Sequence, residues 1–437
     1  MIRIKPYYER PNAQEILACY LNLVADVVPF LPEDVLAGVE EAPDSRSHAP
    51  RSRKPVIDKK DGKEKPCAYV KLLNDDNYRI DQTKPPRVQD ALLAKRIIEV
   101  YSPGDNGLYQ FLYGHPSSKD PGAVNRDNLH RLLTAPFPHG SIPPELRFTV
   151  ERPRMTNLLQ DNVFRYEAFS QKRSEGSRSV YQLLSMLGVS VCPYCNRQYI
   201  TTVAHGRQSV RPQLDHFHNK KDFPYLALSI NNLIPCCGVC NLQKSDEKTE
   251  ILYPYDEEMG GRFVFQARYI DQRSGTQKAI DEDFVSRLQN TGADAKRFDL
   301  SPGIKAENRG GVYIITSLLQ GATDALGTFR IAVEKSGENL DDEFVQRAEN
   351  SLSVLALEQL YQSHKDYVSD LFFQRYIFPE DYFESTQAQF PTLFNTPDDV
   401  KHTLRLMNYA PESWGNRPLA KLTHDIAEQI DELYIEK

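Results

Sequence analysis

Cys192-Pro193-Tyr194-Cys195 and Cys236-Cys237-Gly238-Val239-Cys240 are the two segments that decide the centre of this fold. Each contains a CxxC pair, and two such pairs can supply four thiolates to one tetrahedral Zn²⁺ ion. Cys236 is outside the CxxC spacing, and we expect it to be a small buried side chain. Because four cysteines leave no open coordination position for water, the zinc is expected to be structural. Its predicted ligands are Cys192, Cys195, Cys237 and Cys240.

Composition agrees with a metal site in a soluble protein. The chain has 437 residues, more than one hydrophobic core usually organises, and five of its seven cysteines fall between Cys192 and Cys240. A disulfide framework would spread its cysteines along the chain. No apolar run approaches the ~20 residues of a membrane span, and the first residues lack a signal-peptide layout. We therefore expect a cytoplasmic protein without a membrane partner.

Strand and helix signals fill the segment around the two CxxC pairs. Residues 199–203 are rich in β-branched side chains and predict a strand, and 204–207 predict a turn. Residues 209–217 can return as a second strand that ends in Leu214-Asp215-His216-Phe217. After the second CxxC pair, residues 241–250 have a helix-forming composition. We therefore expect a hairpin, a loop and a helix held together by zinc.

Three short motifs in this region resemble a known family. Asp215-His216, Asn232-Leu233-Ile234-Pro235 and Cys240-Asn241-x-x-Lys244 are similar to the HNH endonucleases with a ββα-metal fold, in the subclass that carries two CxxC pairs. The resemblance covers about 60 residues and has its parts in the right order. Asn219 stands near the place where the family often has proline.

The resemblance implies a role for each matched residue. His216 would be the general base, and Asp215 and Asn241 would be ligands of a catalytic Mg²⁺ or Mn²⁺ ion. Asn232 would brace the loop and the histidine. Many members have histidine at the position of Asn241, and the asparagine favours a hard, oxygen-seeking cation.

Elementary chemistry is consistent with these roles. Phosphodiester hydrolysis needs an activated water, and a neutral imidazole with an ordinary pKa of about 6.5 suits a general base at neutral pH. A cation held by one carboxylate and one amide keeps positions open for phosphate oxygens. The alternative for His216 is an ordinary histidine with satisfied hydrogen bonds. Three lysines are candidates for phosphate contacts, or else form a solvated rim: Lys220, Lys221 and Lys244.

A weaker resemblance suggests a partner. Leu187-Gly188-Val189 before the first CxxC pair, Leu252-Tyr253-Pro254-Tyr255-Asp256, and Leu360-Tyr361-x-x-His364-Lys365-Asp366 are similar to the HNH subunit of Septu-type and retron-associated anti-phage systems. This resemblance implies an effector of antiviral defence that acts with an ABC-type ATPase. The net charge of −7 also argues against a protein that coats nucleic acid through its whole surface.

Together these observations predict an α+β fold. A central ββα-metal HNH unit stapled by a four-cysteine zinc site would cover residues 176–260. A mainly helical region at 1–175, with a basic loop at 46–65, would precede it, and a mixed then helical region at 261–437 would follow. The basic loop is either a solvated segment or an arm that touches phosphates or a partner.

The leading functional prediction is a metal-dependent endonuclease that hydrolyses the phosphodiester bonds of DNA. One alternative is an HNH nuclease that acts on RNA or tRNA. Another is a non-catalytic, zinc-stapled module that binds nucleic acid or protein. The remotest is a zinc-dependent redox or sensor protein that uses Cys236.

Overall fold

A computed structural model describes most of the chain. The described residues are 1–29, 56–57, 64–65, 86–114, 124–171, 179–204, 209–270, 276–279, 329–337, 339–378, 380–405 and 411–432. Helices and small antiparallel sheets together confirm the predicted α+β class. The predicted basic loop at 46–65 lies outside the described residues, except for the antiparallel strands β1 (Val56–Ile57) and β2 (Glu64–Lys65).

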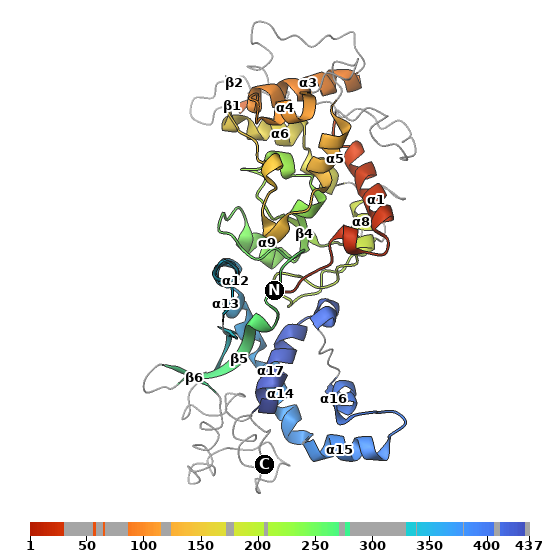
Figure 1. The fold of residues 1–437 in the computed structure, drawn as a ribbon, viewed down its shortest axis with the longest axis vertical. Coiled ribbons are helices and arrows are strands. Elements are labelled where there is room, and N and C mark those ends of the chain that lie inside the picture. The colour runs from red at the N-terminus through yellow and green to blue at the C-terminus, as the bar shows by residue number, and fades with distance from the viewer. Residues whose placement is uncertain are drawn as a thin grey trace.

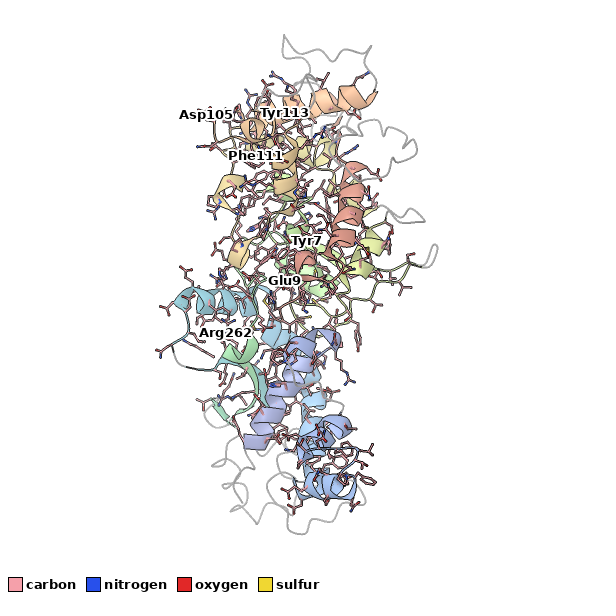
Figure 2. The ribbon with its side chains drawn as sticks, turned by 45° about the vertical axis from the view of Figure 1, so that its right-hand side comes forward. Tyr7, Glu9, Asp105, Phe111, Tyr113 and Arg262 are labelled. Atoms are coloured by element: carbon pink, nitrogen blue, oxygen red, sulfur yellow. The ribbon has the colours of Figure 1, made fainter. Side chains whose placement is uncertain are left out.

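Helices build one end of the elongated molecule (Figure 1). Buried apolar residues at helical spacing on α1, among them Ile16, Tyr20 and Leu23, belong to the main core, and α1 packs against α8. Figure 2 shows Phe111 and Tyr113 of α4 near the far end and Tyr7 nearer the middle. The helices are α1 (Ala13–Ala25), α3 (Pro86–Tyr101), α4 (Leu108–Tyr113), α5 (Arg126–Thr134), α6 (Thr156–Asn162), α7 (Tyr166–Ser170) and α8 (Val180–Leu187).

Helix α8 ends shortly before the first CxxC pair. The Ser179 hydroxyl accepts a hydrogen bond from the Gln182 amide and caps the start of the helix. Gly188 ends it in the left-handed conformation, with φ +55°, which costs glycine no steric penalty. The N-terminal segment also lies against this region, because the Ile2 amide donates to the Pro193 carbonyl at 2.9 Å.

The other end of the molecule combines a three-stranded antiparallel sheet with helices (Figure 1). Strand β5 (Phe263–Ile270) lies between β6 (Gln277–Ala279) and β7 (Phe329–Lys335). Just before β5, at the residue labelled in Figure 2, the Arg262 guanidinium lies 3.5 Å from the centre of the Phe344 ring. The helices here are α12 (Asp342–Val354), α13 (Leu357–Tyr361), α14 (Lys365–Ile377), α15 (Glu380–Gln389), α16 (Pro397–Arg405) and α17 (Ala420–Glu432).

Helix α17 covers one edge of this sheet with side chains. Strand β6 pairs with β5 only at 268–270, which leaves the first half of β5 with an open edge. The Asp425 carboxylate accepts a hydrogen bond from the Phe265 amide at 2.8 Å. The Gln429 side chain accepts from the Ala267 amide at 2.9 Å and donates to the Ala267 carbonyl at 3.0 Å. These bonds satisfy buried peptide groups that would otherwise have no partner at this edge.

The β7 edge is closed in the same way. Glu358 accepts from the Val333 amide at 3.0 Å, and Gln362 accepts from the Ile331 amide at 3.2 Å and donates to the Ile331 carbonyl at 2.7 Å. Both edges thus use two side chains four residues apart. Four helical residues rise ~6 Å and two strand residues span ~6.6 Å, so such a pair matches alternate peptide groups of a strand.

Two expectations for the region around the CxxC pairs are wrong in detail. Residues 199–203 and 209–217 do not form a regular hairpin; within the described part they share the single bridge Val203–Val210. Both valines are largely exposed, so no buried face fixes their register. The helix predicted at 241–250 is α9 (Gly238–Lys244). It begins inside the second CxxC pair, with Cys237 as its N-cap, and it ends at Lys244, where Ser245 with φ +45° terminates it.

Among the described residues, every helix is too short or too polar to cross a membrane.

Candidate metal centre and adjoining polar site

The four predicted cysteines form one buried cluster. The Sγ atoms of Cys192, Cys195, Cys237 and Cys240 all lie within 4.8 Å of one another. Tetrahedral Zn²⁺ with Zn–S bonds of about 2.3 Å places its sulfurs about 3.8 Å apart, and the Sγ atoms of Cys195 and Cys237 are 3.9 Å apart. This distance excludes a disulfide, whose sulfurs are bonded at about 2 Å. The cluster can therefore hold a metal ion such as zinc.

Backbone amides surround the cluster with hydrogen bonds that favour thiolates. The amides of Cys237, Cys240 and Arg197 each donate to a cluster sulfur at 3.4 Å. Hydrogen bonding from the Cys192 thiol lowers the pKa of Cys195 and Cys237, whereas burial raises the pKa of Cys192 and hydrogen bonding with the other three cysteines raises that of Cys240. A soft, buried, closed set of four sulfurs fits structural zinc. Cys236 is fully buried outside the cluster, as its spacing predicted.

Two strands and a helix adjoin the cluster in chain order. Strand β3 (Gln213–His216) pairs antiparallel with β4 (Leu233–Cys236), with Asp215 opposite Ile234 and His216 opposite Leu233. Helix α9 then starts directly from the second CxxC pair and packs against β3. The apolar sequence of β4 is buried throughout, which explains why β4, and not 199–203, is the partner of β3.

Asp215 is buried and fully engaged. Its Oδ2 atom accepts a hydrogen bond from the Tyr194 hydroxyl at 2.6 Å and lies 3.1 Å from the Lys244 ammonium. Burial raises the pKa of Asp215, while Lys244 and Tyr194 act in the opposite direction. The carboxylate is only 3% exposed.

Lys244 forms a buried ion pair with this carboxylate. Its side chain is 3% exposed, and Nζ donates to the His216 carbonyl at 2.8 Å as well as contacting Asp215. A phosphate contact would need the ammonium at the surface, and the structure places it in the interior.

His216 follows Asp215 with its ring fixed by two contacts. The Nε2 atom lies 3.0 Å from the Ala227 carbonyl, and the Tyr166 ring meets the imidazole edge to face at 4.3 Å. Because a carbonyl only accepts, Nε2 carries the proton and the lone pair is on Nδ1. Burial lowers the pKa of His216 to about 3, so the imidazole is neutral at neutral pH but is a weaker base than the ordinary pKa of about 6.5 would make it.

Asn232 braces the loop that follows β3. Its buried Oδ1 accepts from the His218 amide at 2.7 Å, and Nδ2 donates to the carbonyls of His218 and Leu226 at 3.0 Å. These bonds hold both ends of the segment between His216 and Ala227. Asn232 thus holds the loop whose Ala227 carbonyl contacts the His216 ring.

Asn241 and the two remaining lysines are nearer the surface. The Asn241 amide donates to Gln213 Oε1 at 2.6 Å, which connects α9 to β3. Lys220 pairs with Glu167 at 3.0 Å, and Lys221 pairs with Asp246. These two lysines therefore form a rim of mixed charge.

A cation at Asp215 and Asn241 does not fit the arrangement as it stands. The Asp215 carboxylate already receives one hydroxyl and one ammonium, and it is closed to solvent. Mg²⁺ and Mn²⁺ need open oxygen ligands and coordinated water. The donor set alone would suit such a cation, but Lys244 occupies the carboxylate.

Sequence reasoning missed three contacts of this site. Tyr194 could have been noticed, because a tyrosine inside a buried CxxC pair needs a partner for its hydroxyl. Tyr166, which packs on His216, and Gln213, which holds Asn241, carry no local signal.

Compared with protein-family models, curated proteins and solved structures, the chain matches none.

Proposed function

We propose that this chain is an endonuclease of the HNH type that hydrolyses phosphodiester bonds of DNA. The observation that carries the proposal is the state of His216. This neutral histidine ends the first strand of a strand–strand–helix unit beside a four-cysteine cluster, and its Nε2–H is directed at a backbone carbonyl.

In this proposal His216 activates the attacking water. Its Nδ1 lone pair accepts the proton, while the Ala227 carbonyl fixes the ring and stabilises the charge that forms on it. Asn232 keeps the loop that supplies this carbonyl in place. General base catalysis of this kind contributes ~10²–10⁴-fold.

The proposal involves two different metals, a structural zinc ion at the cysteines and a cation that the resemblance implies. Zinc at the four cysteines would connect the start of α9 to the first CxxC pair and so hold the unit together. The resemblance implies Mg²⁺ or Mn²⁺ at Asp215 and Asn241, but the Lys244 ammonium occupies the Asp215 carboxylate, which does not fit such a cation.

Cleavage assays test the proposal. Purified zinc-loaded protein is incubated with plasmid DNA, single-stranded DNA and a tRNA pool in Mg²⁺ or Mn²⁺, beside His216→Ala. His364→Ala is the matched control, because that histidine is also half-buried but contacts Arg197 instead of the site. We expect wild type and His364→Ala to cut DNA and His216→Ala to lose at least ~10²-fold in rate. Equal cutting by wild type and His216→Ala would refute the role of His216, and cutting confined to tRNA would change the substrate.

The proposal extends to a partner of the ABC-type ATPase class in anti-phage defence, as the weaker resemblance implies. The acidic net charge and the mixed-charge rim give the chain little attraction for DNA of its own. If cleavage requires a partner, activity appears only when the co-purified ATPase and its nucleotide are added.

One observation favours a second candidate, a zinc-stapled binding module without catalysis. The buried Lys244–Asp215 pair leaves the cation position closed. Such a module would bind DNA or protein equally well with His216→Ala and would cut under none of these conditions.

A further inference from the structure

The short helix α7 is fastened to the strand that carries His216. Its first residue, Tyr166, donates its hydroxyl hydrogen to the Leu214 carbonyl at 3.1 Å, two residues before His216 on β3. The Tyr166 ring then meets the imidazole edge to face, with ring centroids 4.3 Å apart and 69° between the planes. One tyrosine thus contacts both the backbone of β3 and the side chain that ends this strand.

Two basic side chains, one before β3 and one after it, hold α7 in this position. The Lys220 ammonium pairs with Glu167 at 3.0 Å and lies 5.1 Å from the centre of the Tyr166 ring, where a cation gains from the π face. The Arg211 guanidinium donates to the Ser170 carbonyl at 3.0 Å. Both ends of α7 are therefore tied to the segments that flank β3.

The imidazole of His216 needs a second contact besides the Ala227 carbonyl. The hydrogen bond from Nε2 holds one nitrogen but still allows the ring to rock about this bond. The Tyr166 ring stands against the imidazole and removes that freedom. Orientation of this kind matters, because displacing a reacting group by ~1 Å can cost about 10²-fold in rate.

From these contacts we infer that Tyr166 is the positioning residue of His216. Its ring holds the imidazole in the orientation in which Nε2 faces the Ala227 carbonyl and Nδ1 carries the lone pair. Lys220 and Glu167 hold the tyrosine in place, which gives this lysine a role other than phosphate contact. The inference rests on the proposed function only in treating His216 as a base.

Nitrogen-15 NMR of the histidine rings tests the inference without any cleavage. In the zinc-loaded wild type at pH 7.5, His216 is expected to give two widely separated ring-nitrogen shifts, because a single neutral tautomer is held. His216→Gln identifies these signals by their loss. In Tyr166→Leu, which keeps an apolar side chain without the aromatic wall, the two shifts should move toward each other as both tautomers are sampled. Tyr109→Leu is the matched control, since Tyr109 is also half-buried but stacks on Tyr113.

Tyr166→Phe separates the ring from the hydroxyl. This variant keeps the aromatic wall and is expected to retain the wild-type shifts of His216. Loss of these shifts in Tyr166→Phe would assign the effect to the hydroxyl bond with Leu214 and overturn the role of the ring. Folding of each variant is checked by its melting temperature.

The kinetics of DNA cleavage give a second readout. Tyr166→Leu should lower kcat by about 10–10²-fold and change KM by less than about twofold, because the ring orients the base instead of binding substrate. Tyr166→Phe should recover most of kcat. A rise in KM at unchanged kcat would overturn the inference.

The wild type itself keeps the inference testable if Tyr166→Leu does not fold. Nuclear Overhauser contacts are expected between the ring protons of Tyr166 and His216, and their absence would overturn the inference. Unchanged His216 shifts in a folded Tyr166→Leu would do the same. Failure of the proposed function is a different result: a single tautomer that depends on Tyr166, without cleavage by the wild type, would support the positioning and refute the catalytic role of His216.

Discussion

The side-chain oxygen of Asn196 accepts a hydrogen bond at 3.1 Å from the backbone amide of Lys421, 225 residues further along the chain. Asn196 follows the first CxxC pair directly and has φ +50°. Its own carbonyl accepts from the Leu419 amide at 2.6 Å. The first turn of α17 has amides without intrahelical partners, so a residue beside the metal cluster acts as the cap of a distant helix. A change in the cysteine cluster that moves Asn196 would therefore disturb the first turn of α17.

Removal of zinc is expected to loosen the start of α17. A chelator should increase hydrogen–deuterium exchange in the first turn of this helix, and zinc-loaded Asn196→Ala should do the same at a cost of about 0.5–2 kcal/mol of stability. Ser179→Ala, which removes the cap of α8, is the control and should increase exchange in α8 alone. Unaltered exchange in α17 after complete zinc loss would contradict the connection.

The polar side chains that close the sheet edges are expected to contribute measurably to the free energy of unfolding. Gln429→Leu leaves the amide and carbonyl of Ala267 buried without partners, which costs about 1–3 kcal/mol. Glu428→Leu, on an exposed neighbour, should change stability by less than about 0.5 kcal/mol. Urea unfolding followed by circular dichroism compares the two. Equal losses would mean that the edge bonds contribute little.

The parts of the site that sequence predicted correctly are local in the chain. The two CxxC pairs fix the ligand set because each spacing brings its two thiols together, and the structure gathers the four sulfurs.

The parts that sequence did not predict depend on contacts between distant residues. Lys244 was predicted to contact phosphate or else to stand on a solvated rim, but its position is decided by Asp215 on strand β3. Residues 199–203 have strand propensity but form no strand beside β3, where the buried β4 pairs instead. A pattern of residue types states what a segment can form, and tertiary packing decides which partner it finds.

The number of zinc ions bound per chain should distinguish the four clustered cysteines from Cys236. Cys240→Ser removes one of four thiolates from a closed tetrahedral set and is expected to lose bound zinc and much of the stability that zinc supplies. Cys236→Ser should keep one zinc per chain, because Cys236 is buried outside the cluster. Elemental analysis of the purified variants gives the ratio. Loss of zinc in Cys236→Ser would place that cysteine among the ligands.

Acid is expected to destabilise the protein partly through His218. The imidazole lies among the rings of Phe137, Phe217 and Phe223 at 5.3, 5.1 and 5.6 Å, and burial lowers its pKa to about 4. The unfolded chain, with a histidine pKa of about 6.5, binds the proton more readily between these values. Stability is therefore complete above about pH 6.5 and falls progressively as the pH drops toward 4.

His218→Leu tests this dependence, because leucine suits the aromatic surroundings and cannot take up a proton. The melting temperature of the variant is expected to fall less than that of wild type when the pH is lowered from 7.5 to 4.5. His130→Leu is the comparison, since its imidazole belongs to α5 and lies by Thr134. The residual slope in His218→Leu should come in part from His216, whose pKa is lowered in the same direction. Parallel curves for wild type and His218→Leu would show that protonation of this ring does not oppose folding.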